Sequence, residues 1–525
     1  MLIIVISHVE AEYFSNVAEQ INLDFLHKNG DLGNFNYPEI VGSGVGLFDF
    51  DNDGDLDIYL VQSGNFIQNK SADKLFINNY SDSKVLSFSD ETKSFKLNNN
   101  SYGIGIAIAD INNDGWVDFY LTNLEQNQMY INQKGRGFKL LNIESNHNSW
   151  STSASFCDIN NDGYKDLYVT NYVNWTTKNN PKCYNASSKQ DYCGPSSFEG
   201  LKDRFYINES GTKLVDKTAQ YFSNMPKSPG LNVVCHDVNN DGFNDFIVAN
   251  DGKANLLWLN QKGKSFKESG LFSGLAVNGQ GVAEASMGLA LSDFDLDGDL
   301  DVFFTHLMNE SNTLYKNNGK GYFSDVSNRS KLSAESYAYT GWATGFLMVN
   351  DDIYPDLVIF NGAVADSSKK LTDSVSLKQA NQLFLNTPSS IFVNVKNEQW
   401  LLKKAISRGA AFGDIDNDGD IDIVVNNNNG TPDILLNNQN PKSWMGLKIS
   451  DKLHRNLKIE LFNTNSTIQI NYNTDGAYAS AHDDRIVLNQ AQIEYYNGIR
   501  FLLNNKIILE KPLTKTNKYN PIEIE

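Results

Sequence analysis

The chain has 525 residues, of which 40% are hydrophobic, and its formal net charge is −19. This acidity argues against nucleic-acid binding, because no basic cluster with interleaved aromatic residues offsets it. No apolar run approaches the roughly 20 residues of a membrane-spanning helix.

The N-terminal residues 1–11 are apolar and end in a Val-x-Ala pattern before Glu12. They are typical of the tail of a secretory signal peptide, although the segment is short and lacks a basic start. We expect a truncated signal peptide, with a buried N-terminal strand as the alternative. The first interpretation predicts a secreted, periplasmic or cell-surface protein.

The stretch Asp49–Asp57 is typical of a calcium loop. Oxygen-bearing side chains at positions 1, 3 and 5, a turn glycine at position 6, the backbone carbonyl of position 7 and a carboxylate at position 9 form an all-oxygen shell. Five more intact copies follow, which makes plain turns the weaker interpretation. The predicted ligands are Asp49, Asp51, Asp53, Asp55, Asp57, Asp110, Asn112, Asp114, Trp116, Asp118, Asp158, Asn160, Asp162, Tyr164, Asp166, Asp237, Asn239, Asp241, Phe243, Asp245, Asp293, Asp295, Asp297, Asp299, Asp301, Asp414, Asp416, Asp418, Asp420 and Asp422.

A degenerate seventh copy, the sixth along the chain, keeps Asn350, Asp352 and Asp356 but has Met348 at position 1 and Ile353 where glycine belongs. A β-branched residue at that turn indicates a different backbone, so we expect no ion there. The predicted cofactor is therefore Ca²⁺, with about six ions. Six ions would add twelve positive charges and bring the net charge from −19 to −7.

The loops are predicted to be hairpin connections between strands rather than EF-hands. Short apolar runs flank the first loop at residues 44–48 and 58–61, whereas an EF-hand needs two helices and a glutamate at position 12. Each loop is followed by a second signature in which apolar residues precede asparagine. These signatures are Leu75–Asn78, Met129–Asn132, Phe205–Asn208, Leu257–Asn260, Leu314–Asn317, Leu383–Asn386 and Ile434–Asn437.

A fourth strand per unit is indicated by runs such as Phe138–Leu140, Phe266–Glu268 and Phe323–Val326. Four short strands per unit, seven times over, predict an all-β fold with a seven-bladed β-propeller at residues 12–440. The last unit lacks its own fourth strand, so we expect Phe14–Val17 to complete it and close the ring. Alternating apolar residues after Pro441 predict a small β-domain at residues 441–525, packed against the propeller.

The four cysteines fall into two groups. Cys183 and Cys193 lie in a Pro/Asn/Ser-rich insertion, where we predict that a disulfide braces a loop with little core of its own. Cys157 and Cys235 each lie in a strand that enters a calcium loop. We interpret these two as small core residues.

Several motifs give the chain a family resemblance. They are Pro38–Val45 before the first loop, Asp191–Pro195 in the third unit, and Asp475–Ser480 and Ile493–Gly498 near the C-terminus. The repeats resemble FG-GAP/VCBS repeats of the integrin-α type, and the whole chain resembles the cartilage acidic protein (ASPIC/UnbV) family. The sequence Asn361-Gly362-Ala363 departs from the Asn-Gly-His expected from that resemblance.

The resemblance implies that the calcium hairpins lie on one rim and the connections after each second strand on the opposite rim. Long loops on a rigid scaffold commonly carry recognition. We therefore predict a partner site on the opposite rim, with Trp175, Tyr184 and Tyr192 as candidate contacts. Core packing of these aromatic residues is the alternative.

Two functions remain open. The favoured one is a secreted or periplasmic calcium-binding propeller that acts as an interaction or adhesion module for a protein or glycan. The alternative is an extracellular polysaccharide-active enzyme of the lyase or dehydratase type. No catalytic constellation is recognisable in the sequence, and nothing in it indicates the oligomeric state.

Overall fold

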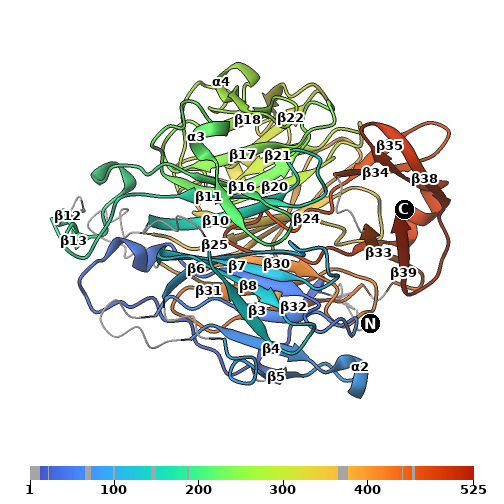
Figure 1. The fold of residues 1–525 in the computed structure, drawn as a ribbon, viewed down its shortest axis with the longest axis horizontal. Coiled ribbons are helices and arrows are strands. Elements are labelled where there is room, and N and C mark those ends of the chain that lie inside the picture. The colour runs from blue at the N-terminus through green and yellow to red at the C-terminus, as the bar shows by residue number, and fades with distance from the viewer. Residues whose placement is uncertain are drawn as a thin grey trace, which may run out of the picture.

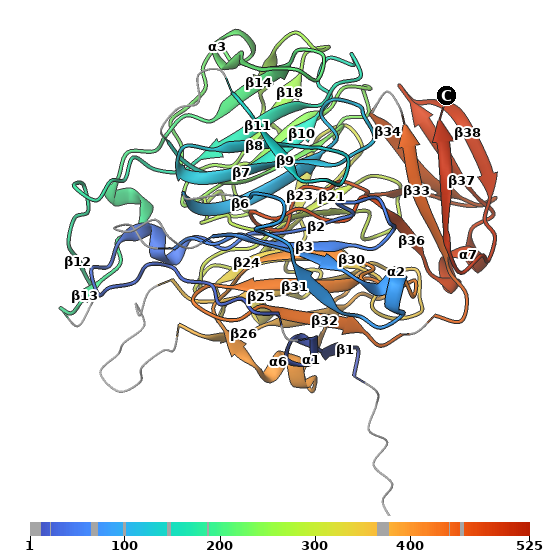
Figure 2. The ribbon, with the colours of Figure 1, turned by 60° about the horizontal axis from the view of Figure 1, so that its bottom comes forward.

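The computed structural model describes residues 12–21, 23–64, 72–97, 101–143, 149–185, 188–364, 377–439, 441–451 and 456–524. The predicted signal-peptide remnant at residues 1–11 lies outside this part of the chain. The fold is all-β (Figures 1 and 2). None of the helices in the described residues is long and apolar enough to cross a membrane.

Most strands belong to seven antiparallel four-stranded units that follow one another along the chain. Unit 1 comprises β2 (Val45–Phe48), β3 (Asp57–Leu60), β4 (Lys74–Asn78) and β5 (Phe88–Asp90), and unit 2 comprises β6 (Tyr102–Ala109), β7 (Asp118–Glu125), β8 (Gln128–Asn132) and β9 (Phe138–Leu141). Unit 3 comprises β10 (Ser149–Cys157), β11 (Asp166–Asn171), β14 (Arg204–Asn208) and β15 (Leu214–Asp216), and unit 4 comprises β16 (Gly230–His236), β17 (Asp245–Asn250), β18 (Leu256–Asn260) and β19 (Phe266–Glu268). Unit 5 comprises β20 (Leu289–Ser292), β21 (Asp301–Phe304), β22 (Thr313–Asn317) and β23 (Phe323–Asp325), and unit 6 comprises β24 (Gly341–Leu347), β25 (Asp356–Asn361), β27 (Gln382–Leu385) and β28 (Val393–Val395). Unit 7 comprises β30 (Ser407–Gly413), β31 (Asp422–Asn427), β32 (Asp433–Asn437) and β1 (Phe14–Asn16).

The other described elements before residue 440 are short. They are α1 (Ala18–Ile21), η1 (Tyr37–Ile40), α2 (Tyr80–Ser83), β12 (Cys183–Tyr184), β13 (Gln190–Asp191), η2 (Pro195–Ser197), α3 (Thr218–Tyr221), α4 (Gly270–Ser273), α5 (Leu332–Ser336), β26 (Gln379–Ala380), α6 (Gln399–Leu402) and β29 (Lys404–Ala405).

The first strands of the units lie side by side in a ring. In chain order β2 contacts β6, β6 contacts β10, and so on through β16, β20, β24 and β30, which contacts β2 again. These strands are buried along most of their length; all eight residues of β6 are buried. A strand that is covered on both faces reads as a continuous apolar run rather than an alternating one.

The seam between the last and first units is closed by the N-terminal strand. β1 pairs antiparallel with β32, with Phe14 opposite Asn437 and Asn16 opposite Leu435. The prediction that this strand completes the last unit is confirmed. It supplies the fourth strand of that sheet and leaves β32 without an open edge.

The core lies between neighbouring sheets. Val45 and Leu47 of unit 1, for example, pack with Ala411 and Val424 of unit 7, and all four side chains are fully buried. Comparable apolar clusters join other neighbouring units. Each sheet is therefore stabilised mainly by apolar burial against the sheets beside it.

The interpretation of Cys157 and Cys235 as plain core residues was wrong. Both are buried, but they form a disulfide that links β10 of unit 3 to β16 of unit 4. They lie 78 residues apart, and only the contact between these two first strands brings them together. The predicted Cys183–Cys193 disulfide is confirmed, and it joins β12 to β13.

Residues 445–524 form two further sheets with their own apolar core. One sheet has the order β36-β33-β39 and the other β35-β34-β37-β38. Their strands are β33 (Met445–Asp451), β34 (Leu457–Phe462), β35 (Thr467–Ile470), β36 (Ile486–Leu488), β37 (Gly498–Leu503), β38 (Lys506–Pro512) and β39 (Tyr519–Ile524), with α7 (Gln490–Tyr495) between β36 and β37. We call this part of the structure the C-terminal cap; it lies on one side of the ring, and β12 and β13 project from the other (Figures 1 and 2).

Candidate metal loops and the face opposite them

The six intact Asp loops each join the first and second strands of a unit, as the hairpin prediction requires. In unit 1, Phe48 pairs with Asp57 across the hairpin. The glycine at position 6 has a left-handed backbone in every intact loop, from φ 84° at Gly115 to 97° at Gly419, whereas Ile353 of the degenerate copy does not. The predicted difference in backbone at Ile353 is confirmed.

The first aspartate of each intact loop is hydrogen-bonded to the turn of its own loop. Its carboxylate accepts the backbone N–H of the position-6 glycine, for example from Gly54 to Asp49 at 3.2 Å and from Gly242 to Asp237 at 2.7 Å. The same bond recurs in the other intact loops. This hydrogen bond to the backbone thus fixes the position of the carboxylate within the loop.

Three of the loops bring carboxylates close enough to share a cation. Their oxygens lie within 4.8 Å of one another in the groups Asp49, Asp51, Asp53; Asp293, Asp295, Asp297; and Asp414, Asp416, Asp422. Buried oxygens in these groups have no hydrogen-bond partner, among them Oδ1 of Asp49, Asp51 and Asp416. Buried oxygens without donors fit the all-oxygen shell that Ca²⁺ requires.

The pKa values of several of these carboxylates are raised above the usual range of aspartate. Burial raises the pKa of Asp414 to about 7, and burial together with the neighbouring Asp418 raises that of Asp416 to about 6. Burial likewise raises the pKa of Asp53 to about 6. A divalent cation would reverse this effect, because it favours the ionised form of every carboxylate around it.

The three loops with asparagine at position 3 satisfy more of their own polar groups. The Asn160 amide donates to Asp162 at 2.9 Å, and its oxygen accepts the Asp162 N–H at 3.0 Å. Asn239 and Asp241 repeat this arrangement. Fewer buried oxygens lack a hydrogen-bond partner in these loops than in the full-acid loops.

The aspartate at position 9 has a role that the sequence did not indicate. Both of its oxygens accept backbone N–H groups, one from position 2 of its own loop and one from the asparagine that ends the third strand. This holds for Asp57, Asp118, Asp166, Asp245, Asp301, Asp356 and Asp422. Because Asp356 keeps both bonds in the degenerate copy, the interaction does not depend on a bound ion.

The asparagine of the second signature connects one unit to the one before it. Its side-chain amide donates to the position-2 carbonyl of the preceding loop, as Asn132 does to Phe50 at 2.9 Å. The same bond is made by Asn208, Asn260, Asn317 and Asn386, and by Asn78, which reaches Ile415 of the last unit. These six bonds form a polar belt that joins successive units from unit 1 to unit 6 and crosses the seam to unit 7.

Replacing one of these asparagines is expected to destabilise the fold. Asn260 is buried and makes bonds to the Ile159 carbonyl, the Asn244 carbonyl and the Gly263 N–H. Asn260→Ala leaves three backbone groups without partners, so we expect a loss of about 2–4 kcal/mol in the free energy of unfolding, measured with denaturant. Gln261→Ala, at the exposed neighbouring position, should stay within about 0.5 kcal/mol; equal losses in both variants would contradict the role of the belt.

The C-terminal cap covers the face that carries the Asp loops. Among the described residues, cap side chains contact five of the seven loops, and a backbone N–H of the cap contacts a sixth. In units 1, 3 and 4 the contacts are Lys448 Nζ to Asp49 Oδ2, Asn456 Nδ2 to Asn161 Oδ1 and Lys458 Nζ to Asn240 Oδ1, each at 3.0 Å. In units 6 and 7 they are Asn489 Nδ2 to the Asp352 carbonyl at 2.9 Å, Arg485 Nη2 to the Asp414 carbonyl at 2.8 Å and Tyr519 Oη to Asp414 Oδ2 at 2.8 Å. In unit 5 the backbone N–H of Gln469 donates to Asp293 Oδ2 at 3.2 Å.

The cap also sends a segment, residues 475–481, into the centre of the ring. We call it the central segment. It contacts the first strand of every unit, through Leu47, Ile106, Ser153, Asn232, Leu289, Trp342 and Gly409. A single segment can reach all of these strands only along the axis of the ring, so it fills the channel there.

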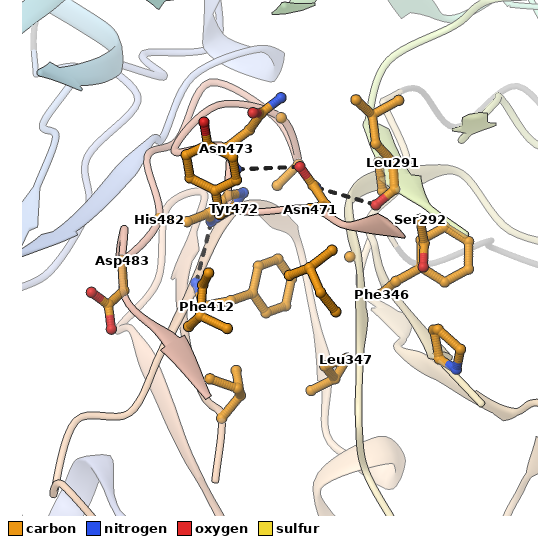
Figure 3. A pocket seen from close by; sticks show the side chains of 18 of the residues that line it. Leu291, Ser292, Phe346, Leu347, Phe412, Asn471, Tyr472, Asn473, His482 and Asp483 are labelled. Carbon is orange, nitrogen blue, oxygen red and sulfur yellow. Dashed lines mark hydrogen bonds between the residues drawn. The ribbon is translucent and has the colours of Figure 1, made fainter. Parts of the chain in front are cut away.

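A cavity of about 210 Å³ lies between the cap and the ring (Figure 3). Phe346, Leu347 and Phe412 line its apolar part, and Asn471 and His482 contribute polar groups. Burial lowers the pKa of His482 to about 4, so the ring is neutral. Its Nδ1 accepts the Phe412 N–H at 3.3 Å, which places the ring proton on Nε2.

The opposite face carries the disulfide-braced segment at residues 171–203, of which 186 and 187 lie outside the described residues. Trp175 is buried and donates through Nε1 to Asn180. Tyr192 is half-buried and donates to Glu39, whereas Tyr184 is 61% exposed. Of the three predicted contacts, only Tyr184 projects freely into solvent.

A second cavity, of about 330 Å³, opens on this opposite face. It lies where β6 and β10 begin and β7 ends, which is the end of the strands remote from the Asp loops. Its aromatic walls are Tyr102, Trp150 and Trp175, and its polar walls include Glu125 and Asn174. Glu125 has a left-handed backbone, with φ 91°.

Comparison with known families supports the repeat assignment. The family described as FG-GAP-like repeat matches residues 49–121, 110–169 and 237–304. These stretches contain five of the six intact Asp loops. No curated protein matches the chain.

The solved structures that match this chain share little sequence with it. A lectin from Agrocybe aegerita, described as recognising non-reducing terminal N-acetylglucosamine, is 16% identical, with 69% of this chain and 82% of that chain covered and a TM-score of 0.43. YCF48 from Cyanidioschyzon merolae is 8% identical (75% and 95% covered, TM-score 0.43), and the rhamnogalacturonan lyase PL11 of Bacillus licheniformis is 11% identical (81% and 75% covered, TM-score 0.39). At these identities and scores, the ligands of those proteins say nothing about this one. The chain is a propeller-like all-β protein that contains FG-GAP-like repeats.

Proposed function

We propose that the seven four-stranded units are the blades of a closed propeller and that calcium ions in the Asp loops stabilise it. We also propose that the face opposite the Asp loops binds a glycan outside the cell. The two disulfides support an oxidising compartment. The cyclic contacts of the first strands and the central segment support the closed ring.

The observation that carries the binding function is the position of the C-terminal cap. It covers the Asp-loop face and fills the central channel, so neither is open to a large ligand. The opposite face retains its long connections and the 330 Å³ cavity. Loops held by a rigid scaffold are suited to recognition, because the scaffold fixes the geometry of the groups they present.

The walls of this cavity suit a sugar ring better than a flat protein surface. The aromatic side chains of Trp150, Trp175 and Tyr102 offer apolar surface, and Glu125 and Asn174 offer groups that bond hydroxyls. A neutral glycan matches this mixture of apolar and polar walls.

Titratable groups near this face do not support catalysis. Tyr37 and Tyr172 share a hydrogen bond of 2.5 Å between their hydroxyls, and Tyr172 donates to Asp251. Burial raises the pKa of Asp251 to about 6. These three side chains bond to one another, and none of them lines the 330 Å³ cavity.

Binding can be tested with the intact protein on a glycan array in calcium buffer. For the glycan that gives the strongest signal, we expect Asn174→Ala and Glu125→Gln each to weaken binding about tenfold, the loss of roughly one hydrogen bond. Lys178→Ala, an exposed change in the same turn that does not line the cavity, should stay within about twofold. An array without any signal, or equal losses in all three variants, would contradict a glycan site in this cavity.

A further inference from the structure

The third strand of unit 5 departs from the pattern of the other units. In six of the seven second signatures the residue before the final asparagine is apolar, and these residues are Ile77, Ile131, Ile207, Leu259, Leu385 and Leu436. In β22 the corresponding residue is Lys316. A lysine therefore replaces an apolar side chain at a position that the repeat otherwise keeps apolar.

The ammonium of Lys316 lies inside the Asp loop of its own unit. Its Nζ contacts Asp297 Oδ2 at 2.9 Å and also contacts Asp295 Oδ2. These aspartates hold positions 5 and 3 of the loop, two of the side chains that would bind a metal ion. Partial burial would lower the pKa of Lys316, but the hydrogen bonds to both aspartates outweigh it and raise that pKa above its usual value.

The other two full-acid loops are not neutralised in this way. In loop 1, Lys448 of the cap reaches only Asp49, at position 1. In loop 7, the Tyr519 hydroxyl donates to the Asp414 carboxylate, and Arg485 donates to the backbone carbonyl of Asp414 rather than to the carboxylates at positions 3 and 5. Within the described residues, an ion pair to the carboxylates at positions 3 and 5 occurs only in the loop of unit 5.

We propose that Lys316 is the built-in cation of the fifth Asp loop, so that this loop binds no calcium in the native protein and becomes a calcium site when the ammonium is removed. The proposal rests on calcium binding by the other intact loops. It changes the expected number of ions from about six to about five, held by the loops of units 1, 2, 3, 4 and 7.

Two physical effects keep calcium out of this loop. The ammonium uses one oxygen each of Asp295 and Asp297, and its charge repels a second cation within a few ångströms. Oδ1 of Asp295 remains buried without a partner, as Oδ1 of Asp51 and of Asp416 do. Without the lysine, the fifth loop would offer the same free oxygens as loops 1 and 7.

An internal cation also changes how this loop responds to calcium. Asp293 accepts the Gln469 N–H of the cap at 3.2 Å, so the fifth loop is one of the points where the cap is attached. Because Lys316 is covalently part of the chain, this attachment does not weaken when calcium is removed. The cap therefore remains anchored at unit 5 under conditions that empty loops 1 and 7.

The test compares calcium stoichiometry in the purified full-length protein and its variants, measured by native mass spectrometry at one fixed free calcium concentration. We expect Lys316→Met to bind one ion more than the unmodified protein. Lys267→Met, which removes an exposed lysine from β19 of the preceding unit, should bind the same number as the unmodified protein. In the unmodified background, Asp295→Asn should lose no ion, whereas Asp416→Asn should lose one.

The outcomes separate this inference from the calcium proposal. A lost ion in Asp295→Asn, or an unchanged count in Lys316→Met, would overturn the role of Lys316 alone. Absence of calcium from every protein, including the unmodified one, would overturn structural calcium and this inference together. Thermal melting gives a second measurement, since Lys316→Met should acquire a calcium-dependent stabilisation that Lys267→Met lacks.

Discussion

Removal of calcium is expected to lower the melting temperature of the protein strongly. Each ion bound to the native state alone contributes about 4 kcal/mol when its free concentration is a thousand times the dissociation constant. Several ions together predict a decrease on the order of 10 °C or more in excess chelator, measured by thermal unfolding. Without the ions, buried carboxylate oxygens such as Oδ1 of Asp51 and Asp416 are left without partners.

The effect should be largest at the seam of the ring. Loops 1 and 7 belong to the first and last units, and Asn417 of loop 7 donates to Asp55 of loop 1 at 2.7 Å. No disulfide within the described residues crosses this seam, which β1 closes by strand pairing. Hydrogen exchange after chelation should therefore rise first in β1, β2 and β30.

Controls distinguish calcium from general electrostatics. Magnesium should restore little of the lost stability, because it requires a tight octahedral shell and retains its waters. Asp416→Asn should be less stable than the unmodified protein in calcium and should lose less on chelation. An unchanged melting curve in excess chelator would contradict structural calcium.

The local elements of this fold could be predicted from the sequence because their signals are local. The turn glycines, the apolar strands and the asparagine signature repeat within each unit, and each reflects a short-range requirement of backbone geometry or burial. The closure by β1 could also be predicted, since one unit lacked a strand and an unpaired strand remained. These inferences needed only the count of elements and the rule that sheet edges are covered.

Longer-range features could not be predicted in this way. The Cys157–Cys235 disulfide depends on the contact of two first strands 78 residues apart. The central segment was recognised only as part of a family-like tail, because nothing in its sequence states that it contacts every unit. The position-9 aspartates look like ligands in the sequence, and only the backbone around them shows that both oxygens are already bonded.

Arg408 carries the second large expected effect. It is fully buried and contacts no carboxylate among the described residues; its guanidinium instead donates to backbone carbonyls and lies 4.0 Å from the ring of Trp342. The acceptors are the carbonyls of Ile40 at 2.7 Å, Gly362 at 3.0 Å, Ser407 at 2.8 Å and Ala363 at 3.2 Å. One side chain thus joins unit 7, the end of β25 in unit 6 and the segment that precedes unit 1.

Two effects oppose each other when Arg408 is replaced. Burial of an unpaired charge is costly, as the lowering of the Arg408 pKa to about 9 by burial indicates, so an apolar replacement removes that cost. It also removes a donor from four carbonyls, at about 1–3 kcal/mol for each that stays buried without another donor; Gly362 keeps the Trp342 indole N–H at 2.9 Å. The second effect is larger, and we expect Arg408→Met to lose about 4 kcal/mol or more in the free energy of unfolding.

The matched experiment compares Arg408→Met, Arg408→Lys and Arg136→Met in denaturant unfolding. Lysine keeps the charge but lacks the planar fork that reaches several carbonyls at once, so Arg408→Lys should also be clearly destabilised. Arg136 is exposed, and its replacement should change stability by less than about 0.5 kcal/mol. If Arg408→Lys were as stable as the unmodified protein, the positive charge rather than the set of hydrogen bonds would hold these three segments together. If Arg408→Met were also as stable as the unmodified protein, neither the charge nor the hydrogen bonds would hold them together.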